Sequence, residues 1–392
     1  MAETLLSAIK ALFCLNRWNV EPRIETWTEA ENIAMGSHVL YAFGKHIALN
    51  DELLHHALKR MLFKSLNKYR LSDISAPVRE IIQKNSPLAW QNIIDDAAKE
   101  TIKLFPSSTA NTFYGYMTLE GNYALKKEDK DLIEDLVKFV QYRVSYSECE
   151  PNKRAFPEDY LDKEEELETK MIKVLENEKL KKLRSSTHTD PSDLKGYLFL
   201  VRKLKHVRRW NRMNRFIEST VLAHTFIVTI LATIFAELGK GEFRPEEGED
   251  VQYKTLLLAL FHDVPEMLTG DIISPVKKIL GQYDPLLLPE IEKELLNELL
   301  LGLPIIIRED IRQKNLFCEP CKDIPFSAAS LVKDCDILAA LMECAFEMAV
   351  GNENPEIRQA FTNYYSLVQN SEWSMVREFS NRVRYEQEAK LF

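Results

Sequence analysis

Apolar positions recur at helical spacing in the second half of the chain. One predicted helix face carries apolar residues three or four positions apart, and His224 lies within this stripe. The apolar members are Ile217, Val221, Val228, Leu231 and Phe235. The same spacing predicts further helices over about residues 254–268 and 328–350. Because such periodicities dominate and only 12 of the 392 residues are glycine, the pattern predicts an all-α protein.

The chain contains one pattern twice. Residues 260–276 repeat the apolar and turn positions of residues 62–78 at a constant offset of 198. Further upstream an Arg-Trp pair occurs in both halves at an offset of 192. The paired residues are Arg17-Trp18 and Arg209-Trp210. A pattern shared over such a distance indicates an internal duplication rather than a short solenoid repeat.

We therefore predict two tandem helical lobes, each large enough to bury its own core. The predicted parts are a first lobe at residues 1–150, a charged helix and linker at 151–192, and a second lobe at 193–392. Residues 185–192 are rich in Ser, Thr, Asp and Pro, which makes them the best candidate for the linker itself.

Charge and composition exclude several classes of protein. The net charge of −9 argues against a general nucleic-acid surface, which requires clustered Lys and Arg. No uninterrupted apolar run of 18 residues and no secretory signal pattern occur, so we expect a cytoplasmic protein without a membrane partner. Cys318 and Cys321 form a single CxxC without a second ligand pair nearby, which favours a structural or incidental thiol pair over a zinc or redox site.

Metal-ligating residue types occur on the inward side of three predicted helices. They are His224 on the first, His262 with Asp263 on the second, and Asp336 on the third. Buried ionisable groups are costly unless they are paired or coordinated. Two imidazoles and two carboxylates suit a first-row divalent cation with open positions for water and substrate. Adjacent residues point about 100° apart on a helix, so His262 and Asp263 reach one ion only at a helix flank or junction.

Glu266 lies four residues after His262 and three after Asp263, hence on the same side of a helix. It is not needed as a ligand and is therefore available to handle a proton. Ordinary alternatives exist, since a lone core His often only packs and a helical Asp often pairs with Arg. The first lobe favours the joint metal interpretation, because all four ligand types are missing there together. The equivalents are Asn32 (Glu31 if the alignment slips by one), Lys64, Ser65 and about Val137.

The second lobe resembles the HD-domain metal phosphohydrolases, and specifically their bacterial 5′-deoxynucleotidase branch. The resemblance rests on the string HDxxExxTGDxxxPVK at residues 262–277, with an Arg-Trp pair upstream and an Asp downstream. It covers most of residues 193–351. Residues 1–145 share only a weakened form of the pattern, in which the metal-ligand types are missing. The resemblance implies an all-helical fold, one divalent ion (Mn, Co, Fe or Zn) on the four ligands, and Glu266 as the acid/base residue. Ile273 departs from the family pattern, which usually has Pro there.

The same resemblance implies substrate contacts. Arg209 and Trp210 would hold the nucleotide phosphate, while Asp271 and Ser274 would recognise the deoxyribose 3′-hydroxyl. Packing or turn formation is the alternative for these residues, because the first lobe keeps its own Arg-Trp pair. Typical members are single-lobe homodimers, so we predict that the first lobe packs against the second as a pseudo-twofold partner. Two independent lobes on a tether are the alternative.

The predicted function is metal-dependent hydrolysis of a phosphate ester on a small nucleotide, with a deoxyribonucleoside 5′-monophosphate as the best specific prediction. A nucleoside triphosphate is an alternative substrate within the same class. A nucleotide-binding sensor or interaction module with little turnover is the alternative from a different class. Glu266 favours the enzyme, because a pure binding module has no need of it.

Overall fold

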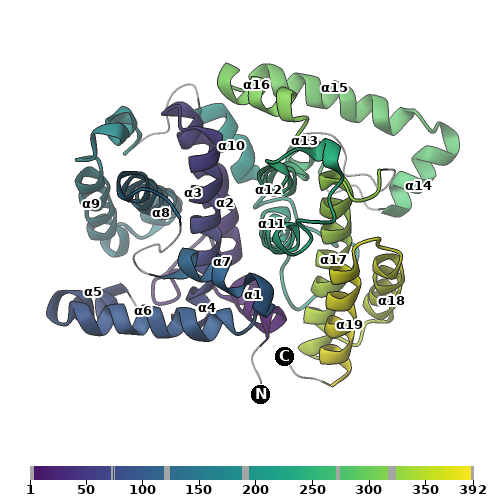
Figure 1. The fold of residues 1–392 in the computed structure, drawn as a ribbon, viewed down its shortest axis with the longest axis horizontal. Coiled ribbons are helices and arrows are strands. Elements are labelled where there is room, and N and C mark those ends of the chain that lie inside the picture. Colours follow the sequence, from purple (N-terminus) through teal and green to yellow (C-terminus); the bar gives the residue numbers. More distant parts are fainter. Residues whose placement is uncertain are drawn as a thin grey trace. The chain divides into compact units, whose positions relative to one another are not determined.

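The computed structural model describes residues 4–71, 74, 76–118, 124–187, 194–270, 274–316 and 324–389. Every regular element within these residues is a helix, which confirms the predicted all-α class (Figure 1). The chain divides into two compact units, Met1–Thr189 and Asp190–Phe392, called the first unit and the second unit from here on.

The second unit is built around three helices that pack against one another: α11 (Val221–Leu238), α12 (Val251–Phe261) and α17 (Ala328–Ala349). α18 (Pro355–Gln369) and α19 (Ser374–Glu388) cover α17 (Figure 1). The remaining helices are α10 (Lys195–Lys203), α13 (Glu266–Thr269), α14 (Ser274–Tyr283), α15 (Leu287–Gly302), α16 (Ile305–Lys314) and the short 3₁₀ helix η2 (Pro245–Glu247).

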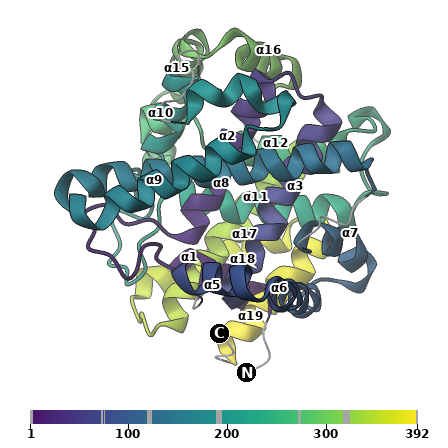
Figure 2. The same cartoon turned by 90° about the vertical axis from the view of Figure 1, so that its left-hand side faces the viewer.

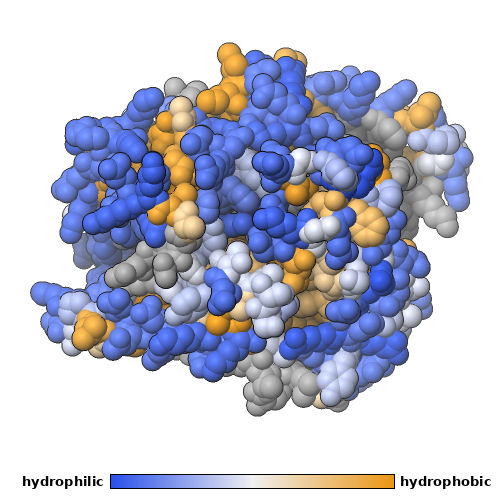
Figure 3. Space-filling view, in the orientation of Figure 1, coloured by the Kyte–Doolittle hydropathy of each residue, from blue (hydrophilic) through white to orange (hydrophobic). Residues whose placement is uncertain are grey.

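The central helix α11 is apolar on nearly all sides. Thr220 caps its start by accepting a hydrogen bond from the Ala223 backbone amide. Among the described residues, α11 alone has the length and composition of a membrane span, with a mean hydropathy of 2.0, yet 89% of it is buried within the protein. A helix that is hydrophobic all round and buried is a core helix. The face of the molecule in Figure 3 is mostly hydrophilic, with separate apolar patches.

The second predicted helix of this unit is interrupted. We expected one helix over about residues 254–268, but α12 ends at Phe261, His262 is its C-cap, and α13 begins at Glu266. Pro265 explains the interruption, because proline lacks the amide hydrogen that would continue the helical ladder. The predicted helix over residues 328–350 agrees closely with α17.

The first unit has a similar centre, in which α2 (Glu29–His46), α3 (Asp51–Leu66) and α8 (Lys127–Ala155) pack together. The charged helix α9 (Pro157–Val174) lies along α8 (Figure 2). The other elements are α1 (Leu5–Cys14), α4 (Lys68–Leu71), α5 (Ala76–Asn85), α6 (Pro87–Ile102), α7 (Ser107–Met117) and the 3₁₀ helix η1 (Glu178–Ser186).

The helices of the first unit continue beyond residue 150. α8 continues past residue 150, and α9 packs against it, so the charged helix is part of the first unit rather than a linker. The division between the units falls at Thr189 and Asp190, within the predicted linker at 185–192. Residues 188–193 lie outside the described residues.

The order and bounds of the helices support the proposed duplication. α2 and α11 both have 18 residues and start 192 positions apart. The pairs α4 and α13, α5 and α14, and α7 and α16 all start 198 positions apart. α9 and α18 also start 198 positions apart, each with a proline. The charged helix α9 is therefore the counterpart of α18.

The segment that carries the Arg-Trp pair has the same local conformation in both units. An isolated antiparallel bridge pairs Asn16 with Thr28 in one unit, and Arg208 with Thr220 in the other. The tryptophan has a left-handed backbone in both, with φ 55° in the first unit and φ 62° in the second. Because that conformation is uncommon for a bulky residue, its occurrence at equivalent positions is further support for a common origin.

Candidate functional site

The four predicted ligands lie together in the second unit. Ligand atoms of His224, His262 and Asp336 all lie within 4.8 Å of one another. His224 Nε2 is 3.1 Å from Asp336 Oδ1 and 3.8 Å from Asp263 Oδ2. His262 Nε2 is 3.1 Å from Asp263 Oδ2. Three helices thus bring two imidazoles and two carboxylates to one place.

The ends of the helices explain how this cluster forms. His224 lies in the first turn of α11 and is fully buried. His262 caps α12, and Asp263 follows in the turn that Pro265 enforces. This turn is the junction that adjacent ligands require, because within a continuous helix they would point apart. Asp336 lies near the middle of α17.

Hydrogen bonds fix both imidazole rings. His262 Nδ1 is 2.7 Å from the carbonyl oxygen of Ala259, which can only accept, so Nδ1 carries the hydrogen. His224 Nδ1 donates in the same way to Glu343 Oε1 at 3.0 Å. The Nε2 atom of each ring is thereby turned toward the carboxylates of the cluster. This is the arrangement in which histidine ligates a metal through Nε2.

The donor set fits a divalent cation. His262 Nε2 and Asp263 Oδ2 are both buried, and among the described residues neither has a hydrogen-bond partner of acceptable geometry, although they are 3.1 Å apart. Buried polar atoms without such a partner are rare and costly. A cation coordinated by both atoms would remove that cost. Mixed imidazole and carboxylate donors suit manganese, iron, cobalt or zinc better than calcium.

Charges in the cluster are strongly coupled. Burial and Arg209 lower the pKa of His224, but Glu343 and Asp336 outweigh them and raise this pKa to about 9. Burial raises the pKa of Asp336, yet Lys333 and His224 hold it well below the ordinary value. The pKa of Asp263 is also lowered, since His262 and His224 offset the effect of burial. Both carboxylates are therefore ionised at neutral pH, as ligands must be.

The remaining described candidates lie beside this cluster. Glu266 begins α13, and its backbone amide donates to the Asp263 carbonyl at 3.0 Å. Arg209 Nη1 is 3.7 Å from Asp263 Oδ2, which places the guanidinium next to a ligand. Trp210 Nε1 donates to Glu343 Oε2. Glu266, Arg209 and Trp210 are thus all connected to groups that hold the cluster.

Several predicted residues cannot be placed. Asp271 lies outside the described residues. Ser274 is the first residue of α14, but the orientation of its side chain is not described. Cys318 and Cys321 also lie outside the described part of the chain.

The first unit holds a different set of side chains at the equivalent place. Asn32 Nδ2 donates to Glu148 Oε1 at 2.7 Å, just as His224 donates to Glu343. This shared contact selects Asn32 over Glu31 as the counterpart of His224. Lys68 Nζ, at the position of Glu266, is 2.6 Å from Glu29 Oε2 and 3.4 Å from Asn32 Oδ1.

The same contact corrects the alignment of the long helices. Glu148 and Glu343 are 195 positions apart, so the counterpart of Asp336 is Gln141 and not Val137 as predicted. This register also aligns Cys149 with Cys344. The conclusion about ligands is unchanged, because glutamine is not an anionic ligand either.

Glu343 was missed in the sequence analysis. It is fully buried on α17, seven residues after Asp336 and hence on the same helix face. The available signal was a glutamate within an otherwise apolar helical stripe, together with its match to Glu148 once Cys149 and Cys344 are aligned.

These features place the second unit in a class. An all-helical unit in which a histidine, a His-Asp pair and a distant aspartate converge is an HD-type hydrolase domain. The particular family follows from comparison with known proteins: residues 196–385 match the family model described as "5′-deoxynucleotidase YfbR-like". The second half of the chain is therefore similar to YfbR-like 5′-deoxynucleotidases, in agreement with this class.

Individual proteins with a similar sequence or structure match only part of this chain. Curated 5′-deoxynucleotidases of Yersinia pestis (strain Pestoides F) and Yersinia pseudotuberculosis (serotype O:1b) are 29% identical over 157 residues, covering 38% of this chain and 72% of each relative. Among solved structures, an HD-domain phosphohydrolase from Listeria innocua aligns with 18% identity and a TM-score of 0.40, covering 49% of this chain and 88% of that one.

Proposed function

We propose that the second unit hydrolyses the phosphate ester of a small nucleotide in a metal-dependent reaction, with a deoxyribonucleoside 5′-monophosphate as the preferred substrate. The observation that carries this proposal is the convergence of His224, His262, Asp263 and Asp336 at the junction of three helices. The family match supports the nucleotide as the substrate class.

A divalent cation bound by these four residues would supply a water of lowered pKa and offset negative charge on the phosphoryl oxygens. Glu266 is the residue that we assign to proton transfer. Its backbone amide donates to the carbonyl of Asp263, three residues earlier, and this proximity supports a role beside the predicted ligands. In this role Glu266 accepts a proton from the attacking water or delivers one to the leaving 5′-oxygen.

Arg209 is the residue that we assign to the substrate phosphate. In the first unit the equivalent Arg17 is held by Glu29 at 2.8 Å and by Ser145 at 2.9 Å, in addition to Glu148. The second unit has Val221 and Ala340 at the positions of Glu29 and Ser145, and neither side chain can hold a guanidinium. Arg209 Nη1 lies instead 3.7 Å from Asp263 Oδ2, so the outer end of the guanidinium faces the predicted ligands, where the phosphoryl group of a bound substrate would lie.

The first unit contributes neither metal nor turnover in this proposal. Its counterparts of the four ligands are Asn32, Lys64, Ser65 and Gln141. Burial and Arg60 lower the pKa of Lys64 to about 8, although Glu134 opposes them. A buried lysine at the place of a metal-ligating histidine repels a divalent cation.

Phosphate release from deoxy- and ribonucleoside 5′-monophosphates and triphosphates, each with added Mn²⁺, Co²⁺ or Zn²⁺, tests the proposal. We expect E266Q to bind metal normally and to lose turnover by roughly a hundredfold or more, the range for a lost general acid or base. K68Q, at the equivalent place of the first unit, is the matched control and should leave turnover unchanged. Nucleotide binding without phosphate release from any substrate would favour the sensor instead, and an active E266Q would remove Glu266 from the reaction.

A further inference from the structure

Glu343 connects the predicted metal ligand His224 with the Arg209-Trp210 pair on the side assigned to the substrate phosphate. Its carboxylate is fully buried on α17 and is contacted by groups from two other segments. His224 Nδ1 is 3.0 Å from Oε1, while the indole nitrogen of Trp210 and Nε of Arg209, at 3.5 Å, contact Oε2. Arg215 Nη1 lies 3.8 Å from Oε2. A buried carboxylate is costly unless it is compensated, and here three hydrogen-bond donors and the positive charge of Arg215 do so.

The contact with His224 acts on a metal ligand. Because a carboxylate only accepts hydrogen bonds, Nδ1 must carry the hydrogen and Nε2 must face Asp336 and Asp263. Glu343 thereby keeps a hydrogen on Nδ1 and fixes the orientation of the ring, so that Nε2 is the nitrogen aimed at the place where a cation would bind. Partners of this kind, outside the ligand sphere, are known to strengthen metal binding by orienting the ligand.

The contacts with Arg209 and Trp210 act on the phosphate side. Trp210 has a left-handed backbone, which is strained for a residue with a large side chain. The hydrogen bond from its indole to Glu343 helps to hold that conformation, and with it the neighbouring Arg209. One carboxylate therefore holds both a ligand and the arginine assigned to the phosphate.

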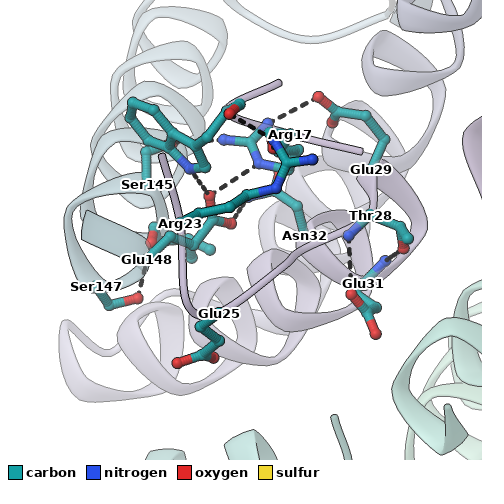
Figure 4. Close-up of polar contacts among 12 residues, drawn as sticks. Arg17, Arg23, Glu25, Thr28, Glu29, Glu31, Asn32, Ser145, Ser147 and Glu148 are labelled. Carbon is teal, nitrogen blue, oxygen red and sulfur yellow. Dashed lines mark hydrogen bonds and ion pairs between the residues drawn. The ribbon is translucent and has the colours of Figure 1, made fainter. Parts of the chain in front are cut away.

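The first unit contains an equivalent buried glutamate, Glu148, with a similar set of hydrogen-bond donors but without the predicted metal ligands (Figure 4). Each of these two glutamates with its donors is called the glutamate hub. Glu148 accepts from Arg17 Nε at 2.9 Å, from Trp18 Nε1 at 2.7 Å and from Asn32 Nδ2 at 2.7 Å. A glutamate in this position thus has a structural role in both units. The second unit differs in that the third donor is a histidine whose other nitrogen faces the predicted metal ligands.

We propose that Glu343 is a positioning residue, which orients His224 for metal binding and holds Arg209 and Trp210 for the substrate phosphate. The part that concerns Arg209 rests on the function proposed above. The part that concerns His224 requires only that the second unit binds a metal.

The test compares E343Q with the matched variant E148Q in the full-length chain. A glutamine amide cannot accept from all the donors around Glu343, because its own NH₂ group also donates. We expect E343Q to weaken Mn²⁺ and Co²⁺ binding by roughly 10- to 100-fold and to change the visible absorption spectrum of bound Co²⁺, which reports ligand geometry. E148Q should lower the melting temperature but leave metal affinity and spectrum unchanged.

Wild-type metal affinity and an unaltered Co²⁺ spectrum in a folded E343Q would overturn the proposal. If E343Q does not fold, E343D keeps the charge but withdraws the carboxylate by one methylene, and the same measurements then decide. A residue that acted only on stability would not move the Co²⁺ spectrum of a folded variant. Because these readouts need no turnover, they remain decisive even if the wild-type protein releases phosphate from no nucleotide, a result that would refute the proposed function alone.

Discussion

Replacing Lys64 with methionine should stabilise the first unit. Lys64 lies near the end of α3, where the second unit has His262, and its side chain is only 23% exposed. Its ammonium is 3.4 Å from Glu134 Oε2, but Arg60 already binds the same carboxylate through two nitrogen atoms. Burial and the positive charge of Arg60 therefore lower the pKa of Lys64 from 10.5 to about 8.

The sign and size of the effect follow from linkage. Below pH 8 the ammonium is charged in both the folded and the unfolded chain, so the folded state carries the whole cost of this charge. The fall of the pKa from 10.5 to about 8 corresponds to about 3 kcal/mol. Screening at the exposed part of the side chain reduces this, so we expect a gain of about 1–3 kcal/mol for K64M at pH 7. The gain should shrink as the pH rises from 8 to 10.5, where the folded wild-type protein releases the proton first.

Denaturant unfolding of wild-type and K64M protein at pH 7, 8.5 and 10 measures the difference in the free energy of unfolding. Groups common to both proteins cancel in that difference. Lys103 is 66% exposed and pairs with Glu100 three residues earlier, so K103M is a control that should change little. If K64M is no more stable than the wild type at pH 7, or if its advantage is the same at pH 10, the reasoning from the buried charge is wrong.

Three further predictions concern the second unit and its relation to the first. Elemental analysis should find one divalent ion per chain, and none after replacing both His262 and Asp263 with alanine; two ions per chain would contradict the assignment. R209A should lower kcat/KM for a nucleotide by roughly tenfold or more, whereas R17A should lower the melting temperature with kcat/KM preserved, and equal kinetic effects would contradict these separate roles. A fragment of residues 193–392 should aggregate or form an active homodimer if the first unit replaces an identical partner, and a monomeric fragment with full activity would refute that idea.

The sequence predicted which side chains lie together better than it predicted the helix that carries two of them. Periodicity placed His224 and Asp336 on the inward faces of their helices. In the structure these two side chains lie in contact. The break before Glu266 was missed, because the apolar pattern continues through residues 254–268 and dominated the prediction. Pro265 contained the necessary information, since a proline in a helical pattern usually ends or kinks the helix.

The error in the first unit has a geometric cause. Val137 and Gln141 are four residues apart, which is one helical turn, so both lie on the same face of α8. An apolar stripe cannot distinguish them. The offset between the two halves changes from 198 at α7 and α16 to 195 along α8 and α17, and such changes in loop length cost little free energy. Only a contact with another element, here that of Asn32 with Glu148, sets the register.

Glu343 shows what periodicity cannot supply. Its partners lie more than a hundred positions earlier in the chain, so no local pattern links them. The comparison with Glu148 shows that the carboxylate and the Arg-Trp pair persist where the metal-ligand types do not. The buried glutamate and its hydrogen-bond donors therefore do not require the metal-ligand residue types beside them. Since the hub keeps its contacts without metal ligands in the first unit, the fold of this corner does not require a metal, and the ligands can change without loss of the fold. That independence explains how two units with similar helices can carry different side chains at the same place.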